Sequence, residues 1–454
     1  MTHIHFIGIG GSGLSAIARL LLESGYVVSG SDRALTPFAD EVRKAGATVY
    51  VGHHPRNIAG ADSIVMSSAV SADNPEVVAA KHANIPVYKR ADFLGQLMAD
   101  KKGIAIAGTH GKTTTTSMIG LVLMEGGIDP TVIVGGKLSG FGGTNARLGH
   151  GQWTVVEADE FDRSFLTLSP TIAVVTNLER EHLDIYSDLD DIKRAFIEFA
   201  NKVPFYGFTA LCLDEPSLVD ILPQMKRRVV SYGSTPQCDV RAVEISYAER
   251  TSTFGVIHNG QRLGNVTVGV PGQHNVKNAL AAVTVGIEVG VPFQNIADAL
   301  ARFTGVYRRF EVKGEVGGVM VVDDYAHHPT EVKATLDAIR QGWNRRIVAI
   351  FQPHTYTRTR DFYEEFGKAF FNAEQTIITD VYPARERPIQ GISGELIANS
   401  ATGFGHRNVL YVPDRNEVAA RALQLIQPGD IVVTMGAGDI WKTADELLEK
   451  LASG

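Results

Sequence analysis

The sequence predicts an α/β protein with three domains in series. Apolar runs typical of buried strands alternate with amphipathic helical patterns over most of the 454 residues, which predicts parallel sheets covered by helices. The alternation restarts at Ile104 and again near Phe310. We therefore expect an N-terminal Rossmann-like parallel sheet over residues 1–98, a central α/β domain over 99–308 with an added antiparallel β part, and a C-terminal Rossmann-like α/β domain over 309–454.

Composition narrows the class of protein. Hydrophobic residues make up 44% of the chain and charged residues 20%, as in ordinary globular proteins. The net charge of −7 argues against a nucleic-acid-binding surface. The chain has no apolar run long enough to span a membrane and no signal-peptide pattern. Cys212 and Cys238 form neither a disulfide framework nor a metal cluster, so we expect both to be free and buried in a protein of the reducing cytoplasm. We expect this protein to be a monomer or a homodimer.

The N-terminal stretch "FIGIGGSGLS" joins an apolar strand to a helical pattern. Such a glycine turn binds a pyrophosphate at the N-terminus of the helix, and an acidic residue about twenty positions later typically contacts a ribose. Asp32, at the end of the second strand, has that position. Taken alone, the pattern is typical of a nicotinamide-dependent oxidoreductase that binds NAD. The alternative is a protein in which the glycine turn binds a different phosphate-containing ligand.

The strongest motif is "GTHGKTTTT" at residues 108–116, between the strand that starts at Ile104 and a helix. It supplies a helix N-terminus, a lysine and a hydroxyl, which a nucleotide phosphate and its Mg²⁺ require. Only two residues separate Gly108 from Gly111, whereas a standard P-loop has four. Despite this shorter spacing, the helix N-terminus, the lysine and the hydroxyl predict that the central domain is of the P-loop, ATP-binding type. Lys112 would contact the β/γ-phosphates and Thr113 the metal. The alternative is an ordinary glycine turn before a threonine-rich helix.

Acidic residues and one histidine follow the next two central strands, where α/β proteins bind ligands. They are Glu157, Asp159, Glu160 and Asp162 in "EADEFD", and Glu181, His182 and Asp184 in "EREHLD". Carboxylates at this edge could hold Mg²⁺, although a solvated acidic turn and a structural histidine are the simpler alternatives. Further polar motifs are "HNVKN" (274–278), "YRRF" (307–310), "DDYAHHPTE" (323–331) and "HTYTRTR" (354–360), whose His354, Arg358 and Arg360 could bind a carboxylate or form a solvated basic loop.

Together and in this order, these motifs resemble those of the Mur ligase family, the ATP-dependent amide-forming enzymes of bacterial peptidoglycan synthesis. The resemblance spans residues 1 to about 445 and is strongest to members that join L-alanine to UDP-N-acetylmuramate. It implies that ATP phosphorylates the lactyl carboxylate, that the amine of L-alanine attacks the acyl phosphate, and that UDP-N-acetylmuramoyl-L-alanine, ADP and phosphate are released. The C-terminal domain would then bind the amino acid and close over the nucleotide.

The resemblance also implies a role for individual residues. Lys112, Glu157, His182 and Arg309 would be catalytic, and Thr113, Glu157 and His182 would bind Mg²⁺. ATP would contact Gly108, Thr109, His110, Gly111, Lys112, Thr113, Thr114, Asn275, Asn278, Arg309 and Asp324. The UDP-sugar would contact Gly8, Gly10, Gly11, Ser12, Gly13, Ser31, Asp32 and Ser68. Tyr325, His327, His354 and Arg358 would bind the amino acid and the substrate carboxylate.

Two positions depart from patterns seen in the family. Thr355 stands where an arginine is usual, which leaves Arg358 or Arg360 to bind the substrate carboxylate. Ile197 occupies the place of a lysine that several members carbamylate, so we expect no carbamylation. A recycling ligase that adds a tripeptide to the same sugar nucleotide is the neighbouring alternative. An oxidoreductase leaves the Lys112 loop unexplained, and a non-enzymatic ATP-driven binding module leaves the C-terminal substrate motifs unexplained.

Overall fold

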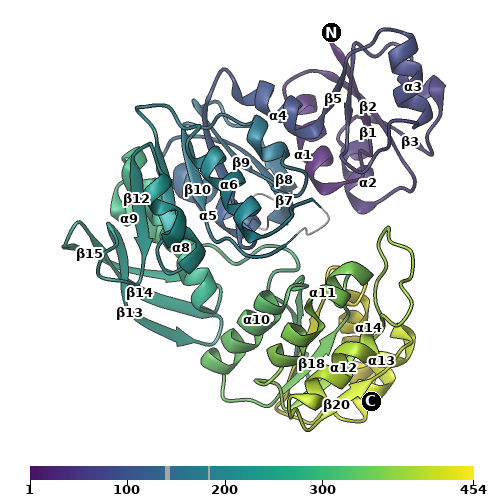
Figure 1. Cartoon of the computed structure of the whole chain (residues 1–454), viewed down its shortest axis with the longest axis vertical. Helices are drawn as coiled ribbons and strands as arrows, with labels where there is room; N and C mark the ends of the chain where they lie inside the picture. Colours follow the sequence, from purple (N-terminus) through teal and green to yellow (C-terminus); the bar gives the residue numbers. More distant parts are fainter. Residues whose placement is uncertain (139–143, 182–184, 454) are drawn as a thin grey trace. The chain divides into compact units, whose positions relative to one another are not determined.

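The computed structural model describes residues 1–138, 144–181 and 185–453 (Figure 1). The chain packs as two compact units. Unit 1 comprises Met1–Ile245, Phe254–Thr267 and Val276–Thr304, and unit 2 comprises Ser246–Thr253, Val268–Asn275 and Gly305–Gly454. The described strands form three sheets. The first strands of two sheets belong to unit 1, and the strands of the third sheet belong to unit 2.

The first sheet is parallel throughout, with the strand order β3-β2-β1-β4-β5. Its central strand has the sequence HIHFI, and the last four residues are buried, as expected for a strand covered on both faces. Side chains of Thr36 and Asn74 cap two of its helices by accepting backbone N–H groups. The elements are β1 (His3–Ile7), α1 (Ser12–Glu23), β2 (Val27–Asp32), α2 (Pro37–Lys44), β3 (Thr48–Val51), β4 (Ser63–Met66), α3 (Pro75–His82), β5 (Val87–Lys89) and α4 (Arg90–Met98).

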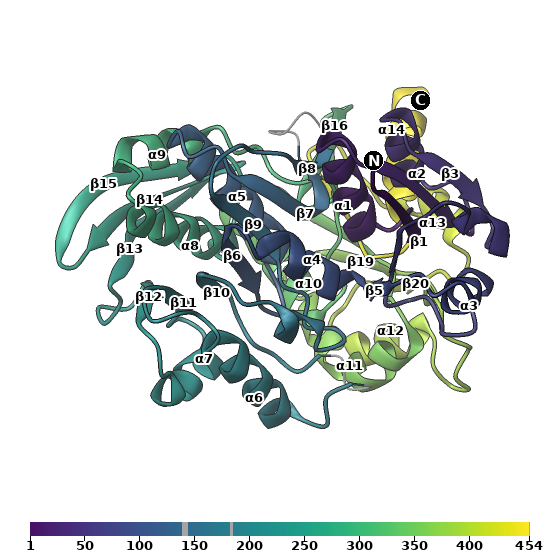
Figure 2. The same ribbon diagram turned by 90° about the horizontal axis from the view of Figure 1, so that it is seen from above.

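The second sheet has ten strands in the order β15-β14-β13-β12-β11-β10-β6-β9-β7-β8. Strands β6, β9 and β10 are parallel neighbours, so their carboxyl ends meet at one edge. Strands β13, β14 and β15 follow one another through two-residue turns, which only antiparallel neighbours allow. Helices α6 and α7 lie next to each other (Figure 2). The strands are β6 (Lys102–Ala107), β7 (Thr131–Leu138), β8 (Thr144–Arg147), β9 (Trp153–Glu157), β10 (Ile172–Val175), β11 (Phe208–Cys212), β12 (Val229–Gly233), β13 (Val240–Ala248), β14 (Thr251–His258) and β15 (Gln261–Val268); the helices are α5 (Lys112–Glu125), α6 (Leu189–Ala200), α7 (Pro216–Ile221), α8 (Gln273–Val289) and α9 (Phe293–Ala301).

The third sheet has the order β16-β17-β21-β18-β19-β20. Only β16 runs antiparallel to its neighbour, and the other pairs are parallel. Its core is aliphatic and includes the fully buried Val348, Ile350 and Val432. The elements are β16 (Glu311–Val316), β17 (Val319–Asp324), α10 (Pro329–Gly342), β18 (Ile347–Phe351), α11 (Tyr356–Ala369), β19 (Gln375–Ile378), α12 (Gly394–Gly403), β20 (Val409–Tyr411), α13 (Arg415–Leu423), β21 (Ile431–Met435) and α14 (Trp441–Ser453).

The predicted α/β architecture with three sheets is confirmed, including the antiparallel addition to the central sheet. The sequence patterns did not identify β7, β8, β15 and β16. One expectation is wrong: Cys212 is free and buried, but Cys238 is only partly buried, because it lies in the loop after β12 rather than on a strand. No helix among the described residues is long and apolar enough to cross a membrane.

Candidate functional site

The loop at residues 108–111 joins the buried strand β6 to helix α5 at the carboxyl edge of the central sheet. Gly108 and Gly111 have φ of +141° and +80°, which glycine adopts at low cost. A Cβ on Gly111 would lie 2.6 Å from the amide oxygen of Asn278. That amide oxygen also accepts a hydrogen bond of 3.1 Å from the Thr115 hydroxyl. Helix α5, which follows this loop, has no side-chain cap at its N-terminus. The N–H groups of its first turn therefore suit an anion.

Residues after β10 hold the loop in place. The Asn177 side chain accepts the His110 N–H at 2.7 Å and donates to the His110 carbonyl at 3.0 Å. The Thr176 hydroxyl donates to the same carbonyl at 2.6 Å. The Thr109 hydroxyl accepts the Glu179 N–H at 2.9 Å. Sequence analysis did not single out Thr176 and Asn177, although their place directly after a buried strand was an available signal.

Lys112 is paired with a buried carboxylate. Its ammonium donates to Glu160 at 2.9 Å and to the Gly108 carbonyl at 2.5 Å. Burial alone would lower the pKa of Lys112, but the charges of Glu160 and Asp159 outweigh it and raise that pKa above its usual value. Burial raises the pKa of Glu160 to about 7, against the opposing effect of Lys112. Lys112 therefore lies charged within the loop, held by a carboxylate that a phosphate would have to replace.

Glu157 ends strand β9 beside the same loop. Its carboxylate accepts the Gly135 N–H from β7 at 2.6 Å and a hydrogen bond from the Thr113 hydroxyl. Burial raises the pKa of Glu157, while these hydrogen bonds and Lys112 act in the opposite direction. A Cβ on Gly135 would lie 2.8 Å from a carboxylate oxygen of Glu157, so only glycine admits this approach. The structure thus brings together Thr113 and Glu157, two of the three expected metal ligands.

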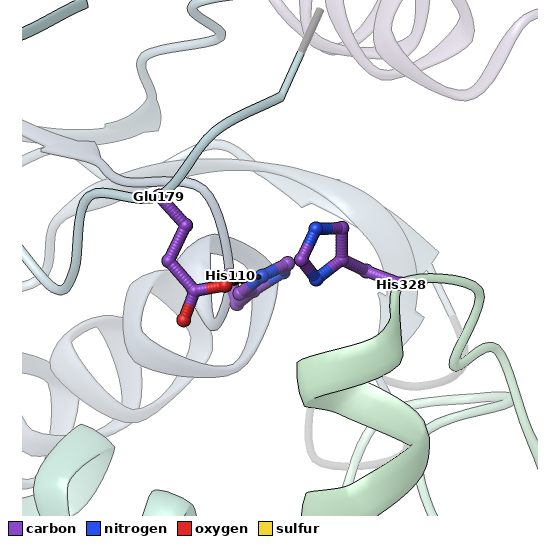
Figure 3. Close-up of side chains that lie close together, drawn as sticks. All are labelled: His110, Glu179 and His328. Carbon is purple, nitrogen blue, oxygen red and sulfur yellow. Dashed lines mark ion pairs between the residues drawn. The ribbon is translucent and has the colours of Figure 1, made fainter. Parts of the chain in front are cut away.

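Figure 3 shows His110 and Glu179, whose side chains form an ion pair of 3.5 Å when the histidine is protonated. The pair joins the loop at residues 108–111 to the segment that follows β10. Glu181, further along this segment, is buried. The third expected metal ligand, His182, and the candidate Asp184 lie outside the described residues.

The N-terminal glycine turn lies between β1 and α1. Gly8 has a φ of +88°, and its N–H binds the Ser31 carbonyl at 2.8 Å. The Asp32 carboxylate accepts the Gly10 N–H at 2.8 Å. Gly11 precedes α1 without a side-chain cap, and Ser12 and Gly13 form its first turn. Asp32 therefore braces the turn, and the end of α1 can bind an anion.

Two expected UDP-sugar residues differ in exposure. Ser68 is exposed in the turn after β4. Ser31 is fully buried, and its hydroxyl donates to the Glu76 carboxylate at 2.5 Å. The structure therefore turns the Ser31 side chain into the interior of the domain, because Glu76 needs donors there; its backbone carbonyl alone contacts the glycine turn.

Glu76 is the centre of a buried polar cluster that sequence analysis missed. Its side chain has 0% exposure and lies 3.6 Å from His5 and 3.4 Å from His53. Asn57 donates to it at 2.5 Å, and the His54 N–H donates at 3.2 Å. Burial alone would raise the pKa of Glu76, but these hydrogen bonds outweigh it and lower that pKa to about 2. The cluster fixes the carboxyl end of β2 beside the glycine turn.

Two further residues connect the N-terminal and central sheets. A Cβ on Gly13 would lie 3.1 Å from the guanidinium of Arg90, which also binds Asp159 at 3.2 Å. The Asn145 amide, on β8, donates to the Ser12 carbonyl at 2.7 Å and to the Ser15 hydroxyl at 2.8 Å. Arg90 thus places a cation at the start of α1, and its position directly after β5 was a signal in the sequence.

The remaining expected ATP residues lie on different parts of the chain. Thr114 is buried in the first turn of α5, and Asn278 contacts the loop as described. Asn275 belongs to unit 2, where its buried amide donates to the Pro271 carbonyl at 2.7 Å.

Unit 2 gathers a second group of expected residues around the end of β17. Arg309 lies 4.9 Å from the Tyr325 ring and 3.6 Å from Glu331. The buried Asp324 carboxylate accepts the Phe310 N–H, the Ala326 N–H and the Thr335 hydroxyl. Burial raises the pKa of Asp324 to about 6, partly offset by Arg309. Asp324 therefore organises the chain around Arg309.

The expected amino-acid residues lie together in unit 2. The His327 ring packs edge-on against Tyr325 at 5.3 Å and against His354 at 5.8 Å. The guanidinium of Arg358 lies 3.3 Å from Nδ1 of His354. Arg360, the other candidate for the carboxylate, pairs instead with the adjacent Asp361 at 2.7 Å. Of the two arginines, Arg358 is thus the one that shares the cluster.

Comparison with known proteins identifies the family. Three family models match the chain in order: "Mur ligase family, catalytic domain" over residues 3–102, "Mur ligase middle domain" over 106–286 and "Mur ligase, glutamate ligase domain" over 308–438. The chain belongs to the Mur ligase family. The sequence-based prediction of this family is confirmed.

Relatives and solved structures of Mur ligases extend over the whole chain. A UDP-N-acetylmuramate–L-alanine ligase of Geotalea uraniireducens is 52% identical over 448 residues, covering 99% of this chain and 98% of the relative. One of Salinibacter ruber is 51% identical over 450 residues, covering 99% and 94%. The crystal structure of the UDP-N-acetylmuramate–alanine ligase of Thermotoga maritima has a TM-score of 0.85 at 29% identity and covers 100% of both chains. A murein peptide ligase of Psychrobacter arcticus has a TM-score of 0.73 at 26% identity, covering 100% and 99%.

Proposed function

We propose that this Mur ligase joins L-alanine to the lactyl carboxylate of UDP-N-acetylmuramate, using ATP and releasing ADP and phosphate. The observation that carries the proposal is the phosphate loop at residues 108–111 with a buried lysine and carboxylates at its mouth. The full-length relatives of about half identity that bear this activity in their names support it. These substrates belong to bacterial peptidoglycan synthesis, which begins in the cytoplasm.

The chemistry requires two anions to meet. The lactyl carboxylate attacks the γ-phosphorus of ATP, ADP leaves, and an acyl phosphate forms. The amine of L-alanine then attacks the acyl carbon, and phosphate leaves as the amide forms. Because carboxylate and γ-phosphate repel each other, fixed positive charge must stabilise the transition state. Lys112 and the N–H groups at the start of α5 supply such charge, and Arg309 is the cation that we assign to the γ-phosphate from unit 2.

Mg²⁺ fits the donors that the structure places beside the loop. Thr113 offers a hydroxyl and Glu157 a buried carboxylate, and such oxygen atoms are the ligands that Mg²⁺ prefers. We assign both residues, with His182, to the metal. Bound there, Mg²⁺ would neutralise phosphate charge and polarise the γ-phosphoryl group.

The other substrates are assigned to the two remaining groups of residues. The glycine turn at residues 8–13, Arg90 and the exposed Ser68 suit the pyrophosphate of the UDP-sugar, because α1 begins there and Arg90 adds a cation. The cluster of Tyr325, His327, His354 and Arg358 suits a small amino acid, whose carboxylate an arginine can bind through two hydrogen bonds.

A phosphate-release assay tests the proposal. Purified enzyme receives Mg-ATP with UDP-N-acetylmuramate and, in turn, L-alanine, glycine, L-serine and other amino acids. We expect phosphate release to require both the sugar nucleotide and an amino acid, with the highest kcat/KM for L-alanine. Equal release in the absence of the sugar nucleotide would refute the proposal.

A tripeptide is the competing acceptor, since murein peptide ligases share the fold. Direct competition separates the two. With L-alanine and the tripeptide at equal concentration, mass spectrometry should detect only the alanyl product; a predominant tripeptide adduct would reassign the enzyme to peptide recycling.

A further inference from the structure

Tyr382 lies against the candidate amino-acid cluster of unit 2, in the segment that follows β19. Its ring stacks on the His354 ring, with a centroid separation of 5.9 Å and an angle of 12° between the planes. No motif in the sequence pointed to this residue. The stack covers one face of an imidazole whose Nδ1 lies 3.3 Å from Arg358, so the orientation of His354 depends on this ring.

The backbone of Tyr382 holds the same segment. Its N–H donates to the Pro353 carbonyl at 2.8 Å, and its carbonyl accepts the Thr355 N–H at 3.0 Å. His354 and Tyr382 thereby form an isolated parallel bridge. Three consecutive residues, Pro353 to Thr355, are thus attached to one tyrosine through main chain and ring.

Thr355 needs such an attachment. It has φ +67° and ψ +144°, a conformation that is costly for a β-branched residue. Strain of this kind persists only where the surrounding structure over-determines it. On its other side, the Thr355 carbonyl accepts the Thr359 hydroxyl at 2.8 Å. The hydrogen bond to Tyr382 therefore completes the restraint that keeps the peptide between His354 and Thr355 in this orientation.

Tyr382 is itself confined by a glycine. A Cβ on Gly438 would lie 2.4 Å from Oε1 of Gln352 and 2.6 Å from Cγ of Tyr382, so a larger residue there would displace both side chains. The carbonyl of Gly438 also accepts a hydrogen bond of 3.2 Å from Arg308. The loop after β21 thus packs closely against the Tyr382 ring.

We propose that Tyr382 is a positioning residue for the amino-acid substrate, acting by fixing the His354 ring and the Thr355 peptide. The inference rests on the proposed function, because it takes the cluster around His354 as the amino-acid site. It differs from a general structural role in predicting which kinetic constant changes. Loss of the ring should weaken the binding of the amino acid and leave the nucleotide sites unaffected.

The test is steady-state kinetics of the full-length enzyme with each substrate varied in turn. For Tyr382→Leu, we expect the KM for L-alanine to rise about tenfold, as the loss of one aromatic contact allows. The KM values for ATP and UDP-N-acetylmuramate should change less than about twofold. Tyr382→Phe keeps the ring and should restore the wild-type KM. Tyr363→Leu is the matched control, since the Tyr363 hydroxyl contacts the neighbouring Glu364 at the surface.

Gly438→Ala provides a second variant in which Tyr382 is intact but displaced, and it should raise the same KM. An independent readout is the NMR signal of the His354 ring, assigned with His354→Gln: Tyr382→Leu should shift it and Tyr382→Phe should not. Equal increases in all three KM values, or an unchanged KM for L-alanine in both Tyr382→Leu and Gly438→Ala, would overturn the inference alone. An unmodified enzyme that does not use L-alanine would overturn the proposed function, and the assigned ligand with it.

Discussion

From the buried carboxylate of Glu76 we predict how the stability of the N-terminal domain depends on pH. Hydrogen bonds lower its pKa from 4.5 to about 2 in the folded chain. A group with a lowered folded-state pKa stabilises the fold above its unfolded pKa, and the stabilisation is lost as the pH falls. A shift of this size corresponds to about 3 kcal/mol, present at pH 7 and lost between about pH 4.5 and 2.

Glu76→Gln removes the charge and keeps the shape of the side chain. Because Trp153, Trp343 and Trp441 all lie outside residues 1–98, tryptophan fluorescence would not report on this domain. Hydrogen exchange measured by mass spectrometry would. We expect amides of β1, β2 and α3 in the variant to exchange about a hundredfold faster at pH 7, which corresponds to that free energy. Peptides from residues 305–453 provide the internal reference.

The pH dependence is the sharper part of the test. After correction for intrinsic exchange rates, the difference between wild type and Glu76→Gln should shrink as the pH falls from 7 to 3. Over this range the carboxylate of the unfolded chain, with a pKa of 4.5, binds a proton, whereas that of the folded chain, with a pKa of about 2, stays largely ionised. Asp92→Asn, at an exposed site on α4, is the control and should leave the exchange rates of these amides unchanged. Equal protection of wild type and Glu76→Gln at pH 7, or a difference that grows on acidification, would refute the reasoning.

Three further predictions concern the catalytic loop, the metal and the backbone. Lys112→Met should lower kcat/KM on the order of a thousandfold, measured by phosphate release, whereas Lys102→Met, at the other end of β6, should not; near wild-type activity of Lys112→Met would contradict our assignment. Chelation of divalent ions should abolish activity and added Mg²⁺ should restore it, and Glu157→Gln should raise the Mg²⁺ concentration needed for half-maximal rate; an unchanged requirement would remove Glu157 from the metal site. Thr355→Gly should stabilise unit 2 by about 1 kcal/mol, since relief of the unfavourable φ exceeds the entropic cost of glycine. Urea unfolding followed by the fluorescence of Trp343 and Trp441 would measure this change, and Thr355→Ser, which keeps the unfavourable conformation, should not stabilise the unit. Destabilisation by glycine would show that the conformation carries no strain.

How far the sequence could be interpreted depended on whether a residue acts locally. The loop at 108–111 was predictable because glycines, lysine and threonine must follow one another at the start of a helix. Glu157 was predictable because it ends an apolar strand of the same sheet. Their partners Asn177, Gly135 and Arg90 were harder to predict. Asn177 and Arg90 directly follow strands, but which loops they reach depends on the order of the strands in space.

Other residues escaped because their surroundings are set by distant segments. Glu76 looks like an ordinary acidic residue in the first turn of α3, and its donors come from three separate segments, which contribute His5, Ser31, and the pair His54 and Asn57. Ser31 was expected at the UDP-sugar, but the same cluster draws its hydroxyl inward. β15 was missed because its sequence, QRLGNVTV, is largely polar on the exposed part of an outer strand, which leaves little apolar alternation to detect.

The antiparallel strands β7 and β8 lie between the two nucleotide sites that we propose and contact both of them. Gly135 on β7 holds the carboxylate of Glu157, and Asn145 on β8 holds the first turn of α1. A ligand that shifts one of these strands would change the free energy of ligand binding at the site beside the other strand. Such coupling is reciprocal: the factor by which the nucleotide changes the affinity for the UDP-sugar must equal the factor by which the UDP-sugar changes the affinity for the nucleotide. A pair of strands that contributes none of the expected site residues would thus couple the two sites, without favouring either order of loading.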